Sequence, residues 1–269
     1  IRIKLLMKKI ISNQSPEKNG VKVEDKEHYT EEFYQGMSLA SLESARIYLT
    51  HLWNFIEPNS VLDVGCGRGA WLKACHELGS NNLYGYDGNW NSQLQMIDES
   101  IEFTSIDLNE PFSLNKEVDL LITLEVAEHL APSSSTQFVK SITSASDSVL
   151  FSAAYTEQGG TNHINEQAHS YWASLFIKNG FVPFDFFRPF FWGDQRVGFW
   201  YQQNTFLYLK RDSDVYKKII DAGFLEIENI NFMDCIHPKL YDLKCGNGIG
   251  VRLLLKELIP SIFRAIKRR

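Results

Sequence analysis

The chain has 269 residues, of which 44% are hydrophobic and 22% are charged, a composition typical of a soluble globular protein with a sizeable core. The net charge of −6 argues against a general nucleic-acid binder, because such proteins carry an excess of Lys and Arg. No apolar run reaches the length of a transmembrane helix. The four cysteines have no C-x-x-C spacing, which argues against a structural zinc site and favours a reducing, cytoplasmic location.

The first two thirds of the chain alternate between helical and strand patterns. Apolar residues recur at helical spacing from residue 29 to 56, and Pro58 ends that helix. Strands are then predicted at residues 60–64, 82–86, 101–106, 118–124 and 148–153, with helical patterns between most of them, including 69–79. This alternation predicts an α/β fold with a doubly wound parallel sheet.

The pattern changes after residue 165. Residues 165–180 are predicted to form a helix, and residues 181–187 and 198–211 two strands joined by a loop with Pro and Gly. A short helix is expected at 213–223 and a basic amphipathic helix at 251–269, broken at Pro260. The last helix is predicted to contact a partner subunit or an anionic membrane surface, or to pack on the core. We divide the chain into a lead-in with a helix (1–38), a central domain (39–210) and a helical extension (211–269).

A glycine turn follows the first predicted strand in the stretch VLDVGCGRGAWL. Gly65, Gly67 and Gly69 let the backbone turn tightly and approach a ligand closely. Their G-x-G-x-G spacing differs from the G-x-G-x-x-G of dinucleotide sites. Asp63 would repel a pyrophosphate but attract a cation, and Asp87 ends the second strand, where an acid conventionally holds ribose hydroxyls. A ligand with a ribose and an ammonium group but no phosphate is S-adenosylmethionine (SAM).

These motifs, with SIDL at Asp107 and LEVAEHL after the fourth strand, resemble class I SAM-dependent methyltransferases over roughly residues 40–210. The resemblance implies a Rossmann-like, seven-stranded, mostly parallel sheet with an antiparallel last strand and helical extensions at both ends. It also implies that Asp63 meets the methionine ammonium group and that Asp87 accepts the ribose hydroxyls. The full set of cofactor-binding residues implied in this way is Asp63, Gly65, Cys66, Gly67, Asp87, Gly88, Asp107, Leu108, Leu124 and Glu125. Asp107 and Leu108 would flank the adenine, and Leu124 and Glu125 would close the floor near the sulfonium.

Acids and histidines follow two neighbouring strands at their carboxyl ends, where ligands of such sheets bind. His129, His163 and Glu128 are the candidate catalytic residues, because a hydroxyl acceptor needs a base to remove its proton. The E-x-x-E-H pattern is similar to ubiquinone-pathway O-methyltransferases and to small-RNA terminal 2′-O-methyltransferases. The second group implies a site for Mg²⁺ or Mn²⁺ formed by Glu125, Glu128, His129 and His163. A metal-free base, a metal site and a structural role for these residues stay open.

The acceptor is predicted to be a hydroxyl of a sugar, a polysaccharide or a related small molecule. Residues 171–201 are rich in aromatic side chains that can stack on sugar faces, although many of them can also form core, and Arg188 could clamp an anion. This segment resembles, loosely, methyltransferases of bacterial surface-polysaccharide loci. The alternatives are an RNA 2′-O-methyltransferase, a nicotinamide-dependent reductase and a non-catalytic SAM-binding scaffold. The acidic charge argues against RNA, and Asp63 with the glycine spacing argues against the reductase.

Overall fold

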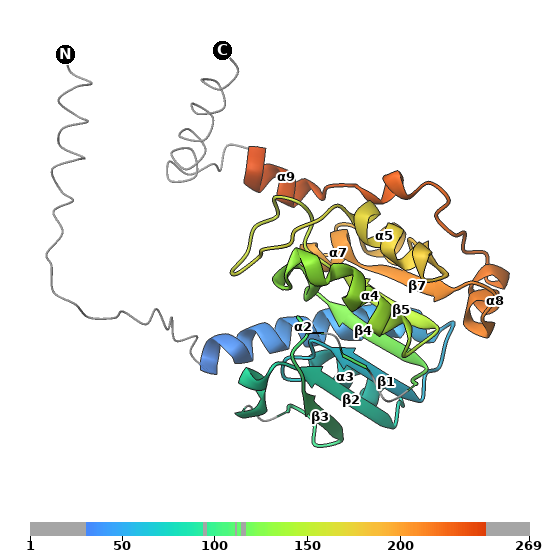
Figure 1. Cartoon of the computed structure of the whole chain (residues 1–269). Coiled ribbons are helices and arrows are strands. Elements are labelled where there is room, and N and C mark those ends of the chain that lie inside the picture. Colours follow the sequence, from blue (N-terminus) through green and yellow to red (C-terminus); the bar gives the residue numbers. More distant parts are fainter. Residues whose placement is uncertain (1–30, 94–95, 111, 114–116, 246–269) are drawn as a thin grey trace, which may run out of the picture. The chain divides into compact units, whose positions relative to one another are not determined.

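The fold centres on one seven-stranded sheet. The computed structural model describes residues 31–93, 96–110, 112–113 and 117–245. The chain divides into two compact units, residues 1–34 and 35–269, and the sheet belongs to the second. The strand order is β3-β2-β1-β4-β5-β7-β6 (Figure 1). The strands are β1 (Ser60–Val64), β2 (Asn82–Asp87), β3 (Ile101–Ser105), β4 (Leu120–Leu124), β5 (Ser148–Ser152), β6 (Phe181–Phe184) and β7 (Phe206–Lys210).

The strand directions confirm the predicted sheet. Strands β1 to β5 pair in parallel, with Leu62 opposite Tyr84 of β2 and Leu121 of β4. β7 runs antiparallel to both of its neighbours, β5 and β6. The sheet reverses its order beside β1, and such a reversal is where ligands bind in open α/β sheets. The five predicted parallel strands match β1 to β5 within two residues at each end.

Helices cover both faces of the sheet, as the alternating side chains require. Along β7, Leu207 and Leu209 join one apolar cluster, and Phe206 and Tyr208 join the other. The first cluster includes buried residues of four helices, which are α2 (Glu31–Trp53), α3 (Ala70–Glu77), α7 (Phe199–Asn204) and α8 (Asp214–Asp221). The second includes buried residues of α4 (Ser135–Thr143) and α5 (His169–Lys178). The predicted helices at 29–56, 69–79, 165–180 and 213–223 correspond to α2, α3, α5 and α8.

Short elements complete the described chain. Four are 3₁₀ turns, which are η1 (Asn89–Gln93), η2 (Ala127–His129), η3 (Pro132–Ser134) and η4 (Ile230–Met233). Three are helices, which are α6 (Arg188–Phe191), α7 (Phe199–Asn204) and α9 (Pro238–Cys245). None of the helices in the described ranges is long and apolar enough to cross a membrane. The basic segment 251–269 lies outside the described residues, so its contact with a membrane or subunit stays a prediction, as do the domain boundaries.

The strand predicted across residues 198–211 is wrong in its first half. Residues 199–204 form helix α7, and only residues 206–210 form a strand. The aromatic residues of this segment favour a strand, but three consecutive polar side chains, Gln202, Gln203 and Asn204, are all buried. The helix turns each of them toward hydrogen-bond partners, which a two-sided strand in an apolar sheet lacks. The strand predicted at 181–187 likewise ends at Phe184.

The glycine turn packs directly against the turn that follows β4. Gly65 has a φ of +84°, and a Cβ atom added to it would overlap the Cγ2 methyl group of Val126. Its N–H donates to the carbonyl oxygen of Tyr86 at 2.6 Å. Because β1 and β4 are adjacent parallel strands, their carboxyl ends emerge side by side. Only a residue without a side chain allows the two turns to approach this closely.

Substituting Gly65 with alanine tests this contact. Gly180 is a matched control, because its φ is +85° and a Cβ atom added there would have no neighbour within 4 Å. We expect Gly180→Ala to cost about 1–2 kcal/mol of unfolding free energy from the left-handed backbone alone. Gly65→Ala should cost a further ~1–3 kcal/mol from overpacking, measured by urea denaturation, and Val126→Ala should relieve this extra loss. Equal losses in the two alanine variants would contradict the packing argument.

Candidate active site

Asp87 braces the glycine turn at the carboxyl end of β2. Its Oδ2 accepts a hydrogen bond from Gly67 N–H at 2.7 Å, and its Oδ1 accepts one from Gly88 N–H at 2.6 Å. The side-chain amide of Asn91 donates to the carbonyl oxygen of Gly67 on the other side of the turn. Burial raises the pKa of Asp87, and the two backbone donors oppose that rise. The carboxylate is therefore held in place beside the turn.

Asp63 and Cys66 are buried near Asp87. Asp63 is 3% exposed, and burial together with the nearby charge of Asp87 raises its pKa well above the usual range. Burial and both acids also raise the pKa of the Cys66 thiol, so this cysteine is not a thiolate nucleophile. A cationic ligand group beside Asp63 would relieve the cost of its buried charge.

Asp107 and Leu108 follow β3 at the same edge of the sheet. Asp107 is exposed, and its Oδ1 accepts a hydrogen bond from Asn109 N–H at 2.9 Å, closing a short turn. Leu108 is buried in the second apolar cluster. The side chain of Asn109 accepts from Ala131 N–H at 2.9 Å, which ties this turn to the segment after β4. The predicted cofactor residues thus all follow or end strands β1 to β4.

Glu125 follows β4 with a left-handed backbone, at a φ of +57°. Its N–H donates to the carbonyl oxygen of Ser152 at 3.1 Å, and its carboxylate faces the amides of Asn204 at 3.1 Å and Gln158 at 3.5 Å. Burial raises the pKa of this carboxyl, and its hydrogen bonds to Asn204 and Ser152 oppose the rise. Sequence reasoning missed Gln158, Gln203 and Asn204. The polar run at residues 202–204 inside an aromatic-rich segment was a usable signal.

Glu128, His129 and His163 come together in one cluster. Each offers one ligand atom, and these atoms lie within 4.8 Å of one another. Glu128 is completely buried, and neither of its carboxylate oxygens accepts a hydrogen bond in the described part of the chain. Burial, and then the charge of Glu125, raises the pKa of Glu128 strongly. An acid in this position requires a proton or a cation, because an isolated buried carboxylate is too costly to persist.

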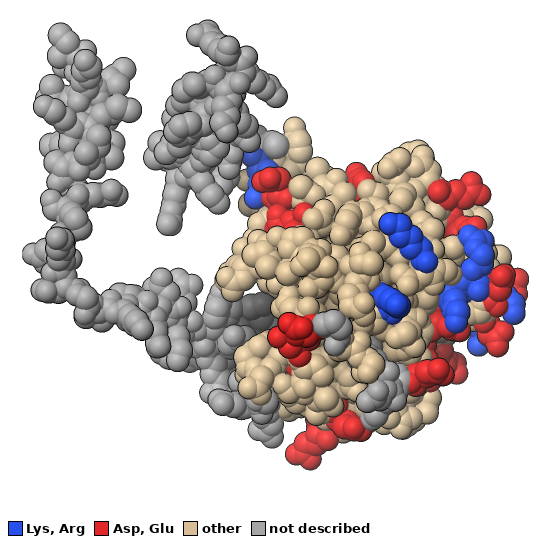
Figure 2. Space-filling model, viewed as in Figure 1, with Lys and Arg blue, Asp and Glu red and all other residues tan. Residues whose placement is uncertain are grey.

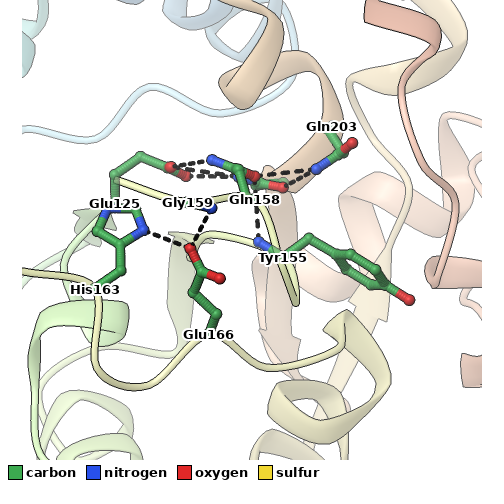
Figure 3. A network of polar contacts seen from close by, with 8 residues as sticks. Glu125, Tyr155, Gln158, Gly159, His163, Glu166 and Gln203 are labelled. Atoms are coloured by element: carbon green, nitrogen blue, oxygen red, sulfur yellow. Dashed lines mark hydrogen bonds and ion pairs between the residues drawn. The ribbon is translucent and has the colours of Figure 1, made fainter. Parts of the chain in front are cut away.

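The two histidines stand edge to face. Their ring centroids are 4.8 Å apart at an interplanar angle of 87°. His129 is exposed as a residue, and partial burial of its ring together with the neighbouring His163 lowers its pKa, which favours the neutral ring. His163 Nδ1 lies 2.8 Å from Oε1 of Glu166, which also accepts from Gly159 N–H at 2.6 Å (Figure 3). Glu166 therefore orients His163 as a carboxylate orients a catalytic or metal-binding imidazole.

The loop that carries His163 is fixed to the turn that carries Glu128. Ile164 N–H and Asn165 N–H both donate to the carbonyl oxygen of Glu128, at 2.9 and 3.0 Å. The side chain of Asn165 donates to Ala127 O at 3.2 Å and to Ser135 Oγ at 2.9 Å. These hydrogen bonds join the two segments that carry Glu128, His129 and His163. The two segments cannot separate unless these bonds break.

A buried, unpartnered carboxylate beside two imidazoles fits a divalent cation as well as it fits a proton. Three of the four side chains that the resemblance implied as ligands lie in this group. The fourth, Glu125, is not in this group, and its carboxylate faces the amides of Asn204 and Gln158. His169 lies elsewhere, buried between Met233 O at 2.9 Å and Asn204 Oδ1 at 3.1 Å.

Solved structures with the same type of domain are similar to this chain. They include human N-acetylserotonin methyltransferase in complex with SAM (17% identity, 66% of this chain, 55% of that chain, TM-score 0.45). Another is a putative O-methyltransferase from Nostoc punctiforme (16% identity, 66% and 59% covered, TM-score 0.48). A third is the putative methyltransferase bound to the Trm112 activator of Haloferax volcanii (15% identity, 67% and 94% covered, TM-score 0.49). The chain spans about half the length of the human enzyme and of several others.

The curated proteins include no sequence that matches the chain. The profile of a family described as a methyltransferase domain matches residues 43–189, which is more than half of the chain. The matched range includes the glycine turn, Asp87, Asp107 and the whole cluster of Glu128, His129 and His163. The chain therefore belongs to the methyltransferase-domain family and has the Rossmann-like fold of SAM-dependent methyltransferases.

Proposed function

We propose that this protein transfers the methyl group of SAM to a hydroxyl of a sugar, a polysaccharide or a related small acceptor. The observation that carries the proposal is the cluster of Glu128, His129 and His163 beside the glycine turn. Methylation of a hydroxyl needs a group that removes or weakens its proton, whereas many other nucleophiles do not. Two histidines and a buried acid, placed where the methyl donor binds, supply such a group.

The residues around the glycine turn suit SAM. Asp63 offers a negative charge to the methionine ammonium group, and Asp87 offers carboxylate oxygens to the ribose hydroxyls. Leu108 and Leu124 provide apolar surface for the adenine and the floor of the site. SAM supplies an activated methyl group when it is bound, and the protein aligns the acceptor oxygen with it.

In the metal-free version, a neutral imidazole accepts the acceptor's hydroxyl proton. His129 is suited to this step because it is exposed and its lowered pKa favours the unprotonated ring. His163 is suited because Glu166 holds its Nδ1 side, which fixes the ring and stabilises the imidazolium after proton transfer. The ionised form of Glu128 would stabilise either imidazolium through its charge.

In the metal version, Glu128, His129 and His163 would hold Mg²⁺ or Mn²⁺. Such an ion lowers the pKa of a bound hydroxyl and fixes its position. An RNA 2′-O-methyltransferase is the second candidate, because three of the four ligands that this resemblance implies, Glu128, His129 and His163, lie together. The surface argues against it: on the face in Figure 2, basic groups near α8 lie beside acids, as in the pairs Lys210–Asp147 and Arg211–Glu226.

The aromatic segment supports a sugar acceptor only through its exposed members. Phe184, Phe186 and Phe187 are fully buried and form core. Trp192 and Trp200 are each 37% exposed, which leaves ring faces available to stack on a sugar. Arg188 is buried and donates to Met233 O at 2.8 Å, so its predicted role as an anion clamp is replaced by a structural one.

Asp87→Asn and Asp87→Ala test the cofactor assignment. We expect Asp87→Ala to weaken SAM binding by about 1.5–3 kcal/mol, because it removes hydrogen bonds to a charged group, and Asp87→Asn to weaken it less. Asp119→Ala is the matched control, since Asp119 also accepts backbone N–H bonds but lies at the opposite end of β1. Calorimetry that gives the same SAM affinity for Asp87→Ala and the wild type would refute the assignment.

The base role predicts large losses in turnover. With an acceptor found by a methyl-release screen of glycans, nucleotide sugars and small RNAs, the variant that removes the base, His129→Ala or His163→Ala, should lower kcat by about 10²–10⁴-fold. The SAM affinity should stay nearly constant. The control is His76→Ala, because His76 pairs with Asp98 at the surface of α3. Full activity in the His129/His163 double variant would rule out both versions of the mechanism.

The pH dependence of kcat/KM tests His129 as the base. Since burial and His163 lower the pKa of His129, the ring becomes protonated only at a pH below its usual 6.5. Activity should therefore persist through pH 7 and 6.5 and fall as the pH drops further. A half-maximal point above pH 6.5 would contradict this role.

Chelation separates the two versions. If a metal is required, EDTA should abolish turnover, Mg²⁺ or Mn²⁺ should restore it, and Glu128→Gln should mimic EDTA in activity and in loss of metal binding by calorimetry. In the metal-free version EDTA leaves turnover unchanged.

A further inference from the structure

A network of side-chain amides surrounds the carboxylate of Glu125. Asn204 Nδ2 donates to both carboxylate oxygens, at 3.1 and 3.3 Å, and Gln158 Nε2 lies 3.5 Å from Oε2. Gln203 Nε2 donates to Asn204 Oδ1 at 3.0 Å and to Gln158 Oε1 at 3.1 Å. In Figure 3 the dashed lines lead from the carboxylate of Glu125 through Gln158 to Gln203. The donors come from the loop after β5 and from α7.

Two backbone N–H groups fix which way the amides face. A backbone N–H can only donate, so His237 N, at 2.7 Å, identifies the atom of Gln203 that it meets as the oxygen. The other polar atom of the Gln203 side chain is then its NH₂ group, which donates to Asn204. The atom of Asn204 that it meets must therefore be the oxygen, and the NH₂ group of Asn204 faces Glu125. Tyr155 N–H fixes the oxygen of Gln158 in the same way, at 3.2 Å. A carboxylate only accepts hydrogen bonds, so in this orientation the amide of Asn204 faces Glu125. The oxygen of Asn204 also lies 3.1 Å from Nε2 of His169, which must carry a proton to donate to it.

The parts that fix the amides of Gln203 and Asn204 lie after the range matched by the family profile, which ends at residue 189, whereas Tyr155 and Gln158 lie within it. Gln203 and Asn204 belong to α7, and His237 directly precedes α9. The segment before His237 is itself anchored, because Met233 O accepts from Arg188 and Asp234 accepts from both the N–H and the hydroxyl of Ser170. The chain beyond the family match is therefore built into the site.

We infer that Asn204, aligned by Gln203 and the backbone of residues 233–237, is a positioning residue that fixes the carboxylate of Glu125 beside His163 for methyl transfer. The inference rests on the proposed function. Glu125 needs such support because it lies close to the acid Glu128, and two carboxylates repel each other. Small displacements of a group in an active site cost large factors in rate, so a residue that never touches the substrate controls kcat here.

Gln203→Glu tests the inference with one atom changed. The variant keeps an oxygen that accepts from His237 N–H, but the NH₂ group that faced Asn204 becomes a second oxygen. The side chain of Asn204 then flips, so that its NH₂ group meets this new oxygen and its own oxygen faces Glu125. Gln202→Glu is the matched control, because Gln202 is the adjacent buried residue of α7 and contacts Gly193 N, Asp194 O and Val197 O instead. In the methyl-release assay, kcat should fall at least 10-fold in Gln203→Glu, with SAM affinity within twofold. Gln202→Glu, corrected for its folded fraction, should change kcat less than threefold.

A second measurement decides the inference without an acceptor. In the Gln203→Glu background the turned amide of Asn204 presents an oxygen, and Glu125→Gln supplies an NH₂ group to meet it. Glu125→Gln should therefore recover part of the Tm lost in Gln203→Glu but none of that lost in Gln202→Glu. Equal Tm shifts from Glu125→Gln in all three backgrounds, or a kcat unchanged by Gln203→Glu, would overturn the inference. If no acceptor is methylated, the proposed function fails, and the Tm cycle alone decides whether the network positions Glu125.

Discussion

The central constraint of this structure is the contact between two turns at the carboxyl ends of adjacent strands. Gly65 after β1 and Val126 after β4 touch so closely that no side chain fits at residue 65. This contact places the turn suited to SAM next to the turn that carries Glu125, Glu128 and His129. The parallel pairing of β1 with β4 makes the contact possible, and the bonds from Ile164 and Asn165 to Glu128 bring His163 to the same place. The site is thus a consequence of strand order more than of any single loop.

Carboxylates dominate this edge of the sheet, and their environments differ in an informative way. Asp87 accepts two backbone N–H bonds, and Glu125 accepts side-chain amides. Glu128 has no such partner in the described residues, and Asp63 is buried beside the charge of Asp87. Acids whose carboxylates already accept hydrogen bonds hold the site together. Acids that are buried without such bonds are suited to bind a cationic ligand group, a proton or a metal ion.

Much of the fold and the ligand turn could be predicted from sequence because their signals are local. The apolar runs of β1 to β5, the spacing of Gly65 and Gly67, and Asp87 at the end of β2 all depend on neighbours within a few residues. Helix α7 could not be predicted in this way, because its polar side chains are satisfied by residues distant in the chain, such as Gln158 and His237. For the same reason the contacts of Glu125 with the amides of Asn204 and Gln158 appear only in three dimensions.

A crystal structure with S-adenosylhomocysteine bound would test the central claim most directly. The account predicts that both ribose hydroxyls lie within hydrogen-bond distance of the Asp87 carboxylate and that the amino group lies beside Asp63. The sulfur atom should then face the side of the site where Glu125, His129 and His163 converge. A ligand bound with its ribose away from Asp87, or with its sulfur turned from the two histidines, would contradict the account.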